Sequence, residues 1–412
     1  MENLIYRERR LAVRSLRTLL ILLFSRVGNY IPIPGVTDIE SFYENSFQNT
    51  SIYTLSALSG GSNVITIFTL GLGPFFSASL VTQLLVKFYS PFEKLQNEEG
   101  DEGRKTIARY TRLFTICFCI IESIFLSNSL RLFVFNWTFA SYIIVALAVT
   151  AGSLILVWLG EIISERGIGN GSSLLILFSN LARFPDFLVN KIDAFDFNFQ
   201  NKTYVFYVII TLVVMIVLNV FIQEGSRKLT VLSSRQLAKN NLDDIKRSYL
   251  PIRFSQGGVL PIIFASSLLL TVSTFMKKSD TFSFIFSTNQ IFYFAIFLPL
   301  MAVFSFFYTL LILSPGDISK NLKKMSSVIS DIKSGPATKI FLRKVILQAS
   351  LVGSILLSMV MLIPYIFAAF VGVPSLPIPG ITSLILCFTI VTDTLRQIVA
   401  FRDTRRFLLI SD

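Results

Sequence analysis

Six ionisable residues lie in or beside long apolar stretches of this 412-residue chain, and they are the first candidates for chemistry. They are Arg26, Glu122, Glu161, Glu165, Asp393 and Arg396. Charged side chains in apolar segments are costly, so they typically mark a proton or substrate path. A transporter for a small solute needs such groups near the middle of the membrane, whereas five of the six lie near the ends of their stretches. A secondary transporter therefore stays open as an alternative function.

Other residue types argue against an enzyme. The chain contains no His, which removes the commonest general base and metal ligand. Cys117, Cys119 and Cys387 fall within apolar segments, and none has a partner at metal-ligand spacing, so they are interpreted as buried thiols. The apolar stretches hold no paired Asp and no nucleophile motif. We predict no catalytic residue, no metal and no cofactor.

The elements that carry these residues are membrane helices. With 53% hydrophobic and 15% charged residues, the chain is too apolar for an ordinary soluble domain. A helix needs about 20 apolar residues to cross a bilayer. Ten apolar runs approach this length: 18–34, 66–86, 113–130, 139–159, 168–182, 203–222, 259–275, 291–313, 345–366 and 379–395.

The basic residues predict the orientation of these ten helices. If the N-terminus is cytosolic, the cytosolic segments contain 30 of the 37 Lys and Arg residues. Cytosolic loops of membrane proteins carry such an excess, so both termini are expected in the cytosol. The largest basic segments are the loops 224–256 and 317–344. Residues 1–17 are basic but lack a small-residue cleavage site, so no removable signal peptide is expected.

A glycine-rich hinge joins the fourth and fifth runs. Residues 160–173 contain Glu161, Glu165 and Arg166 together with glycines at positions 167, 169 and 171. Taken alone, the pattern fits a cytosolic turn before a helix. It also fits a hinge that lies inside a protein assembly or at the water-filled entrance of a channel. Irregular backbone near hydrocarbon needs hydrogen-bond partners from protein or water.

Two long motifs decide the family that the chain resembles. Trp158-Leu159-Gly160-Glu161 followed by Glu165-Arg166-Gly167-Ile168-Gly169-Asn170-Gly171 resembles the signature of the SecY family, and Phe24-Ser25-Arg26-Val27-Gly28-Asn29-Tyr30-Ile31-Pro32-Ile33-Pro34-Gly35 is a second match. Shorter matching pieces follow in family order from about Leu16 to Thr394. The resemblance implies the channel subunit of the Sec translocon, which passes unfolded polypeptides across a membrane and releases hydrophobic segments into lipid.

The same resemblance implies an all-α polytopic fold. Ten transmembrane helices would form two inverted five-helix halves, 1–185 and 186–412, around a central hourglass pore. Residues about 51–62 would form a short re-entrant plug helix, although by themselves they also fit an extracytosolic loop. The plug residues are Ile52, Tyr53, Leu55, Leu58, Gly60 and Gly61.

The family pattern also assigns the pore and its lateral gate. The pore ring would consist of Leu72, Phe76, Ile176, Ile263 and Leu386. A narrow apolar ring dewets and so blocks ions without binding substrate side chains. Phe76 departs from the aliphatic residue usual there. The lateral gate would include Ser77, Ser79 and Gln83, which also fit ordinary hydrogen bonding between helices.

The basic loops would dock partners in this family. The docking residues would be Arg227, Lys228, Arg235, Lys239, Lys246, Arg247, Lys323, Lys324 and Lys333. This chain departs from the family pattern at two places in these loops. Asn240 and Asn241 stand where the family has a pair of Arg, and Lys333 stands where it has a single Arg. Lys keeps the charge but lacks the planar fork of Arg. As an alternative, these solvated basic loops would only fix the orientation of the helices in the membrane.

The resemblance further implies partners and a location. The expected partners are SecE and SecG-like small subunits, the SecA motor ATPase, ribosomes, unfolded preproteins and membrane lipid. Forty Phe, no His, and many Asn, Ile and Lys indicate an AT-rich genome. An algal plastid fits this composition and places the protein in the thylakoid membrane, with a bacterial plasma membrane as the alternative.

Overall fold

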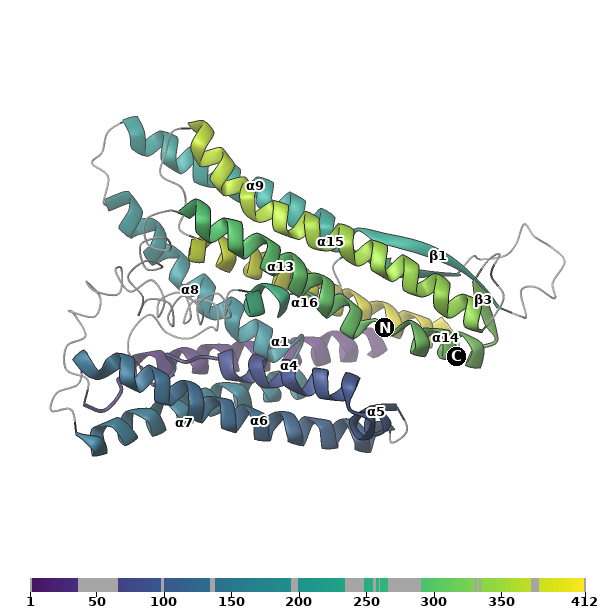
Figure 1. Cartoon of the computed structure of the whole chain (residues 1–412), viewed down its shortest axis with the longest axis horizontal. Coiled ribbons are helices and arrows are strands. Elements are labelled where there is room, and N and C mark those ends of the chain that lie inside the picture. The colour runs from purple at the N-terminus through teal and green to yellow at the C-terminus, as the bar shows by residue number, and fades with distance from the viewer. Residues whose placement is uncertain are drawn as a thin grey trace. The chain divides into compact units, whose positions relative to one another are not determined.

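The computed structural model describes residues 2–35, 66–97, 100–133, 138–193, 199–233, 248–254, 257–258, 260–265, 290–329, 332, 335–371 and 378–410. Over these residues the protein is mostly helical and divides into two compact units (Figure 1). The first unit comprises the described parts of Met1–Val205 and Leu376–Asp412, and the second those of Phe206–Ala265 and Asn289–Ser375. The predicted inverted halves, 1–185 and 186–412, stay a prediction.

The first unit consists of helices. They are α1 (Glu2–Val27), the 3-10 turn η1 (Gly28–Tyr30), α4 (Gly73–Phe88), α5 (Ser90–Asn97), α6 (Gly100–Ser129), the 3-10 turn η2 (Leu130–Phe133), α7 (Phe139–Arg166), α8 (Gly171–Asp193) and α16 (Ile378–Ile410). Helix α6 packs against both α4 and α7, while α8 contacts α1, α7 and α16. A capping box of Thr138 and Ser141 starts α7, since each side chain bonds the other residue's backbone N–H.

The second unit combines helices with a small sheet. It holds most of α9 (Phe199–Glu224), then β1 (Ser226–Ser233), β2 (Ser248–Arg253), the helical residues 260–265, α13 (Gln290–Ile312), α14 (Pro315–Lys324), β3 (Ser327–Ile329) and α15 (Pro336–Val371). Helix α13 packs along α15. Near the far end of α15, the buried Tyr207 hydroxyl of α9 donates a hydrogen bond of 2.6 Å to the carbonyl oxygen of Pro364.

The predicted membrane runs lie mainly in helices, but residues 31–34, 66–72 and 168–170 of these runs are not helical. Among the described residues, five stretches are long and apolar enough to cross a membrane: Glu102–Asn128, Phe139–Arg166, Ala295–Lys324, Pro336–Pro364 and Thr382–Ala400. Gly171–Ala182 and Ile209–Glu224 are shorter apolar helices. Of the predicted run 259–275, only residues 260–265 are described, and they are helical. The protein is thus a mostly helical membrane protein with several apolar spans.

Helical structure continues well beyond the apolar runs. Helix α1 begins at Glu2, α16 ends at Ile410, and α5 with the start of α6 occupies most of the basic segment 87–112. Helix α5 folds back on α6 through Phe92 and Tyr110, whose ring centroids lie 5.0 Å apart. Lys, Arg and Glu are good helix formers, so polarity marks the edge of the membrane rather than the end of a helix.

The three strands correct the all-α prediction. They form one antiparallel sheet in the order β2-β1-β3, with Leu229 opposite Leu250 and Val231 opposite Ile329. The sheet lies in the two basic segments that were interpreted only by their charge. Alternation is visible in β1, where the exposed Lys228 and Thr230 flank the buried Leu229.

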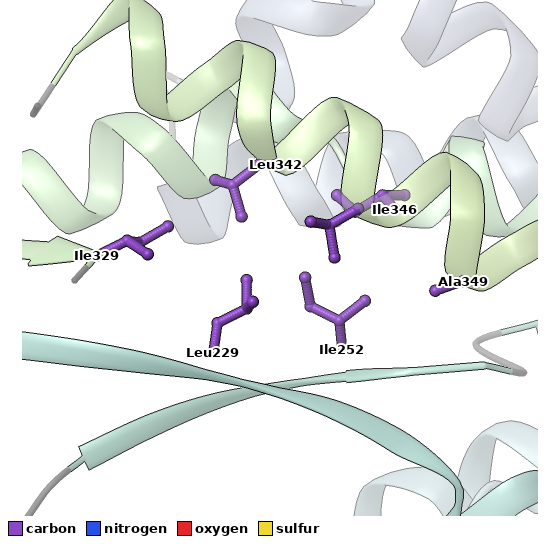
Figure 2. Close-up of a cluster of buried hydrophobic side chains, with 7 residues drawn as sticks. Leu229, Ile252, Ile329, Leu342, Ile346 and Ala349 are labelled. Atoms are coloured by element: carbon purple, nitrogen blue, oxygen red, sulfur yellow. The ribbon is translucent and has the colours of Figure 1, made fainter. Parts of the chain in front are cut away.

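One face of this sheet packs on α15. Leu229, Ile252 and Ile329 of the strands meet Leu342, Val345, Ile346 and Ala349 of the helix, and all are buried (Figure 2). Apolar side chains from three strands and one helix form one continuous cluster, which holds the sheet against α15. The opposite face of the sheet carries the exposed Lys228 and Tyr249, with the Lys228 Nζ atom 5.0 Å from the centroid of the Tyr249 ring.

Candidate functional site: pore residues, hinge and basic sheet

A non-helical segment of seven residues, 66–72, leads into α4. Its backbone N–H groups find local partners: Thr66 N–H donates to Thr69 Oγ1 at 2.9 Å, and Ile67 N–H donates to the Ile31 carbonyl at 3.2 Å. Pro32 and Thr66 form an isolated antiparallel bridge. Irregular backbone at membrane depth is tolerated only where protein or water satisfies it. Here the protein does so.

The segment ends at the first two predicted ring residues. Leu72 is the N-cap residue of α4, and its carbonyl accepts a 3.2 Å hydrogen bond from the N–H of Phe76. Both side chains are buried, with 1% and 4% of their surface exposed. Their spacing of four places them on one face of the helix start. The ring of Phe76 meets that of Phe75 edge to face, with centroids 5.5 Å apart.

The other ring residues are also apolar and buried. Ile176 lies on α8 and Leu386 on α16, two helices that pack together in the first unit. Ile263 lies in the second unit, in the helical residues 260–265, where the neighbouring Phe264 ring lies 6.4 Å from that of Tyr308. Four of the five ring residues therefore belong to the first unit, and Ile263 belongs to the second.

The hinge between α7 and α8 is shorter than the motif, because α7 continues to Arg166 and only residues 167–170 separate the helices. Gly169 has a φ of +85°, a left-handed conformation that favours glycine. Gly171 is required for a different reason, since a Cβ atom there would overlap the carbonyl oxygen of Gly160. The two helices thus meet backbone to backbone.

Side-chain hydroxyls satisfy the hinge's backbone. Ser164 Oγ donates to the Gly160 carbonyl at 2.9 Å and accepts from the N–H of Gly171 at 2.9 Å. From α1, Thr18 Oγ1 accepts from the N–H of Ile168 at 3.1 Å. Thr18 was not predicted as a hinge residue. It lies 150 positions away, and no local pattern in the sequence connects it with the hinge.

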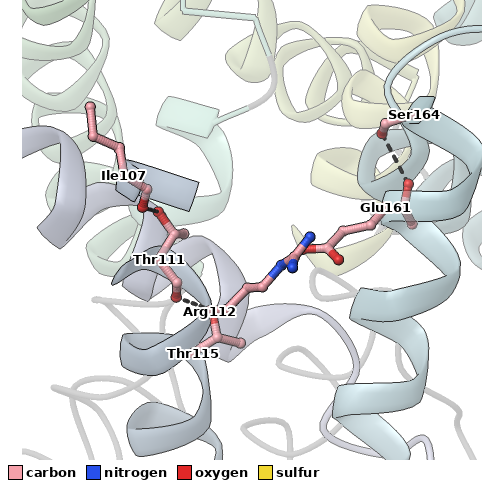
Figure 3. Close-up of polar contacts among 7 residues, drawn as sticks. Ile107, Thr111, Arg112, Thr115, Glu161 and Ser164 are labelled. Atoms are coloured by element: carbon pink, nitrogen blue, oxygen red, sulfur yellow. Dashed lines mark hydrogen bonds and ion pairs between the residues drawn. The ribbon is translucent and has the colours of Figure 1, made fainter. Parts of the chain in front are cut away.

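An ion pair joins α6 to α7 near the hinge. Arg112 Nε donates to Glu161 Oε1 at 2.8 Å (Figure 3), with side chains that are 55% and 29% exposed. On α16, Asp393 and Arg396 form a second pair at 3.3 Å. Glu165 is exposed and Arg26 is half-buried. The ionisable candidates Glu161, Asp393 and Arg396 are thus engaged in ion pairs within the first unit.

The predicted gate residues lie on α4. Gln83 Nε2 donates to Ser79 Oγ at 3.2 Å, and Ser77 Oγ donates to the Gly73 carbonyl at 3.3 Å. Both of these side-chain hydrogen bonds thus lie within α4. Glu122, another of the ionisable candidates, is half-buried on α6, which packs against α4.

Several predicted site residues lie outside the described residues. They are the plug residues Ile52, Tyr53, Leu55, Leu58, Gly60 and Gly61, the docking residues Arg235, Lys239, Lys246, Arg247 and Lys333, and the substituted positions Asn240 and Asn241. Of the docking residues that are described, Arg227 and Lys228 lie on β1, and Lys323 and Lys324 lie in the last turn of α14. Arg227 Nη1 donates to Gln348 Oε1 of α15 at 3.3 Å.

Comparison with known proteins gives consistent matches. The model of the family described as SecY matches residues 66–395. A protein translocase subunit SecY from the alga Diacronema lutheri is 63% identical over 410 residues, which cover 97% of this chain and 98% of that protein.

Solved structures share the fold. One, on how the plug domain of the SecY protein stabilises the closed state of the translocation channel, has a TM-score of 0.66 at 17% identity and covers 94% of this chain and 91% of the other. Sec61 in a canine ribosome–channel complex from the endoplasmic reticulum has a TM-score of 0.57 at 16% identity, with the same coverage.

Proposed function

This chain belongs to the SecY family, and we propose that its ten helices enclose a pore through which unfolded polypeptides cross the membrane. As a family member it is the protein-conducting channel subunit of the Sec translocase and not an enzyme. Membership of this family decides between the two function classes that the sequence left open. The single observation that carries the conclusion is the match over residues 66–395, which includes all five ring residues.

The resting seal comes from the ring. Leu72, Phe76, Ile176, Ile263 and Leu386 are apolar and buried. A constriction lined by such residues excludes water, and ions then face a dewetting barrier. The same surface offers no hydrogen bond to a passing chain, so it does not retain any one substrate. The segment 51–62 closes the outer side of this ring as a plug.

The seal can be tested by making the ring polar. Ile176→Asn combined with Ile263→Asn should wet the constriction and raise the resting ion conductance of the reconstituted translocon in planar bilayers, while export persists. Deletion of residues 52–60 should act in the same direction through loss of the plug. Ile176→Val with Ile263→Val is the matched control, because it keeps the ring apolar. Unchanged conductance in both the Asn variant and the deletion would reject the pore assignment.

Sideways release into lipid requires a seam beside α4. Apolar residues such as Leu favour membrane insertion by about −0.3 to −0.6 kcal/mol each, whereas a charge costs about 2.5 to 3.5 kcal/mol at the centre. A seam with polar residues opens more readily than one closed by apolar packing. Ser77, Ser79 and Gln83 supply such polar groups on α4, and the hydrogen bond of Gln83 to Ser79 supports this role.

The basic sheet and α14 dock the partner that drives translocation. Lys228 is exposed on the sheet face that points away from α15, and Lys323 and Lys324 are exposed at the end of α14. Ribosomal RNA and an acidic surface of the SecA motor are both attracted to such charges, with an attraction that salt screens. The canine relative was solved in a ribosome–channel complex, which supports the ribosome as one partner. SecE and SecG-like subunits complete the translocon.

Charge reversal separates docking from topology. Arg227→Glu with Lys228→Glu and Lys333→Glu should weaken the binding of ribosomes and of SecA to channel-containing liposomes, most strongly at low salt. Insertion should stay normal, because most cytosolic Lys and Arg residues remain. Lys333→Arg is the matched control, since it keeps the charge. Full binding of both partners by the triple variant at low salt would assign the loops to topology alone.

The protein resides in the thylakoid membrane of a plastid, with its basic loops in the stroma. The algal relative at 63% identity supports this location, as does the AT-rich residue usage. A bacterial plasma membrane is the alternative. Immunolocalisation in the source cells distinguishes the two.

A further inference from the structure

Two glycines in the middle of long helices each hold the backbone of another segment. A Cβ atom on Gly152 of α7 would overlap the carbonyl oxygen of Ile67 and lie 2.6 Å from its carbonyl carbon. A Cβ atom on Gly353 of α15 would overlap the carbonyl oxygen of Phe254. Both glycines are buried, and neither has a positive φ. Glycine is needed at these positions because of space alone.

Each held segment has a second glycine contact, with a glycine that directly follows α1 or α9. Gly28 follows α1, and a Cβ atom there would overlap the ring of Phe68. Gly225 follows α9, and a Cβ atom there would lie 2.6 Å from Cδ2 of Phe254. Backbone hydrogen bonds accompany both contacts: Ile67 N–H donates to the Ile31 carbonyl at 3.2 Å, and Phe254 N–H donates to the Gly225 carbonyl at 3.0 Å.

The two units thus contain the same arrangement, which we name the backbone clamp. In the first unit Gly28 and Gly152 hold Ile67 and Phe68, and in the second Gly225 and Gly353 hold Phe254. Each clamp grips a segment between the end of one helix and the middle of another. A contact made by backbone atoms does not adapt as a side-chain contact does, because no rotamer change relieves an overlap with a carbonyl group.

Each clamp precedes a predicted ring residue in the sequence, by five positions from Ile67 to Leu72 and by nine from Phe254 to Ile263. Leu72 follows Ile67 by five positions in the segment that the first clamp fixes. Ile263 follows the second clamp in the helical residues 260–265, whose start is held by the Leu260 N–H bond of 3.3 Å to the Gly257 carbonyl. Gly257 in turn abuts Pro261 and Tyr308.

We propose that Gly152 and Gly353 are positioning residues of the channel, which set the place of Leu72 and Ile263 through the backbone clamps. The inference rests on the proposed pore ring. A methyl group on either glycine displaces the clamped segment and with it the ring residue that follows. The closed seal then loses its fit, although the helices keep their membrane topology.

The test is the resting conductance of the purified translocon carrying Gly152→Ala or Gly353→Ala in planar bilayers. Because the added methyl group overlaps a carbonyl group and displaces the clamped segment, we expect a rise in resting conductance on the order of tenfold for each variant. Matched controls are Ala151→Ser on α7 and Val352→Ile on α15, which enlarge exposed neighbours on the same helices. Conductance at the parental level in both glycine variants would overturn the proposal, as would a leak of equal size in the controls.

A double substitution distinguishes positioning from a general loss of structure. Gly28→Ala meets the side chain of Phe68, so Phe68→Leu should restore the seal in the double variant. Phe68→Leu should not rescue Gly152→Ala, where the obstacle is the Ile67 carbonyl. If Gly152→Ala fails to accumulate, the comparison of Gly28→Ala with the Gly28→Ala, Phe68→Leu double variant tests the proposal. A leak in Gly28→Ala that Phe68→Leu leaves unchanged would contradict the clamp. A leak in Ile176→Asn with Ile263→Asn, but none in the clamp variants, rejects the clamp while leaving the pore assignment intact.

Discussion

The α7–α8 hinge and the β1–β2–β3 sheet connect long helices by different physical means. At the hinge, Gly171 brings the backbone of α8 against Gly160, and hydroxyls of Ser164 and Thr18 bond the freed N–H groups. The sheet is held instead by apolar side chains, with Leu229 and Ile252 against Leu342 and Ile346 of α15. One connection depends on the absence of side chains and the other on their volume. Enlarging a residue should therefore damage the hinge, and shrinking one should damage the sheet.

The largest effect is expected for Gly171→Val at the hinge. The added Cβ atom overlaps the Gly160 carbonyl, and the branched side chain gives no rotamer that avoids it. We expect the helices to separate and the protein to fail to accumulate in the membrane. Quantitative immunoblotting of membrane fractions measures this. Ser173→Ala, two residues on, should accumulate normally, and equal accumulation of Gly171→Val would contradict the close backbone contact.

A cavity in the sheet's cluster should have the next largest effect. Leu342 is fully buried among the strands, so Leu342→Ala should lower the free energy of unfolding by about 2–5 kcal/mol. Cys117 is exposed, so the interpretation of all three Cys as buried thiols was wrong for this residue. In a Cys117→Ser background, thermal unfolding in detergent can be followed by maleimide labelling of buried thiols: Cys119 and Cys387 in the first unit, and a Ser350→Cys substitution on α15 for the second. Leu342→Met keeps the volume and should cost less than about 1.5 kcal/mol. Equal losses in the two variants would mean that packing volume does not hold the sheet.

Loss of the α1 contact should weaken the hinge more modestly. Thr18→Val removes the hydroxyl that accepts from the N–H of Ile168, with an expected loss of about 1–3 kcal/mol for a donor left without its partner. Thr18→Ser keeps the hydroxyl and should retain most of the stability. The same thiol-labelling assay compares the three proteins. A valine variant as stable as the parent protein would show that this hydrogen bond does not stabilise the hinge.

The smallest effect is expected for the ion pair beside the hinge. Arg112 is 55% exposed, so Arg112→Gln should change the free energy of unfolding by only about 0–1 kcal/mol, and less at high salt. Unfolding midpoints at low and high salt measure the difference. A loss above about 2 kcal/mol would place this pair in the same class as the backbone contacts.

Much of the fold was predictable because hydropathy and charge are properties of single residues that add along the chain. Most described residues of the apolar runs are helical, although 31–34, 66–72 and 168–170 are not. The all-α prediction was wrong for the basic segments, where charge concealed the alternation of Lys228, Leu229 and Thr230 that forms β1. The helical extension of α1 back to Glu2 was likewise not predicted, since a polar helix carries no apolar run.

The candidate site divides in the same way. The sequence motif located the hinge, and the glycine at 169 adopts the left-handed conformation for which glycine is suited. The motif did not reveal which atoms the glycines approach. That Gly171 faces the Gly160 carbonyl, or that Thr18 bonds Ile168, depends on helices that are separate in sequence.

By itself the sequence determined the membrane class and, through its ordered motifs, the family, and it predicted an orientation from the Lys and Arg residues. Only the tertiary structure decided the register of the sheet and the packing partners of Leu229 and Leu342. It also decided the close backbone contacts of Gly152 with Ile67 and of Gly353 with Phe254. The physical reason is the distance along the sequence over which each property is decided. Transfer into a membrane is summed residue by residue, whereas a close contact depends on atoms that the folded chain brings together from distant positions.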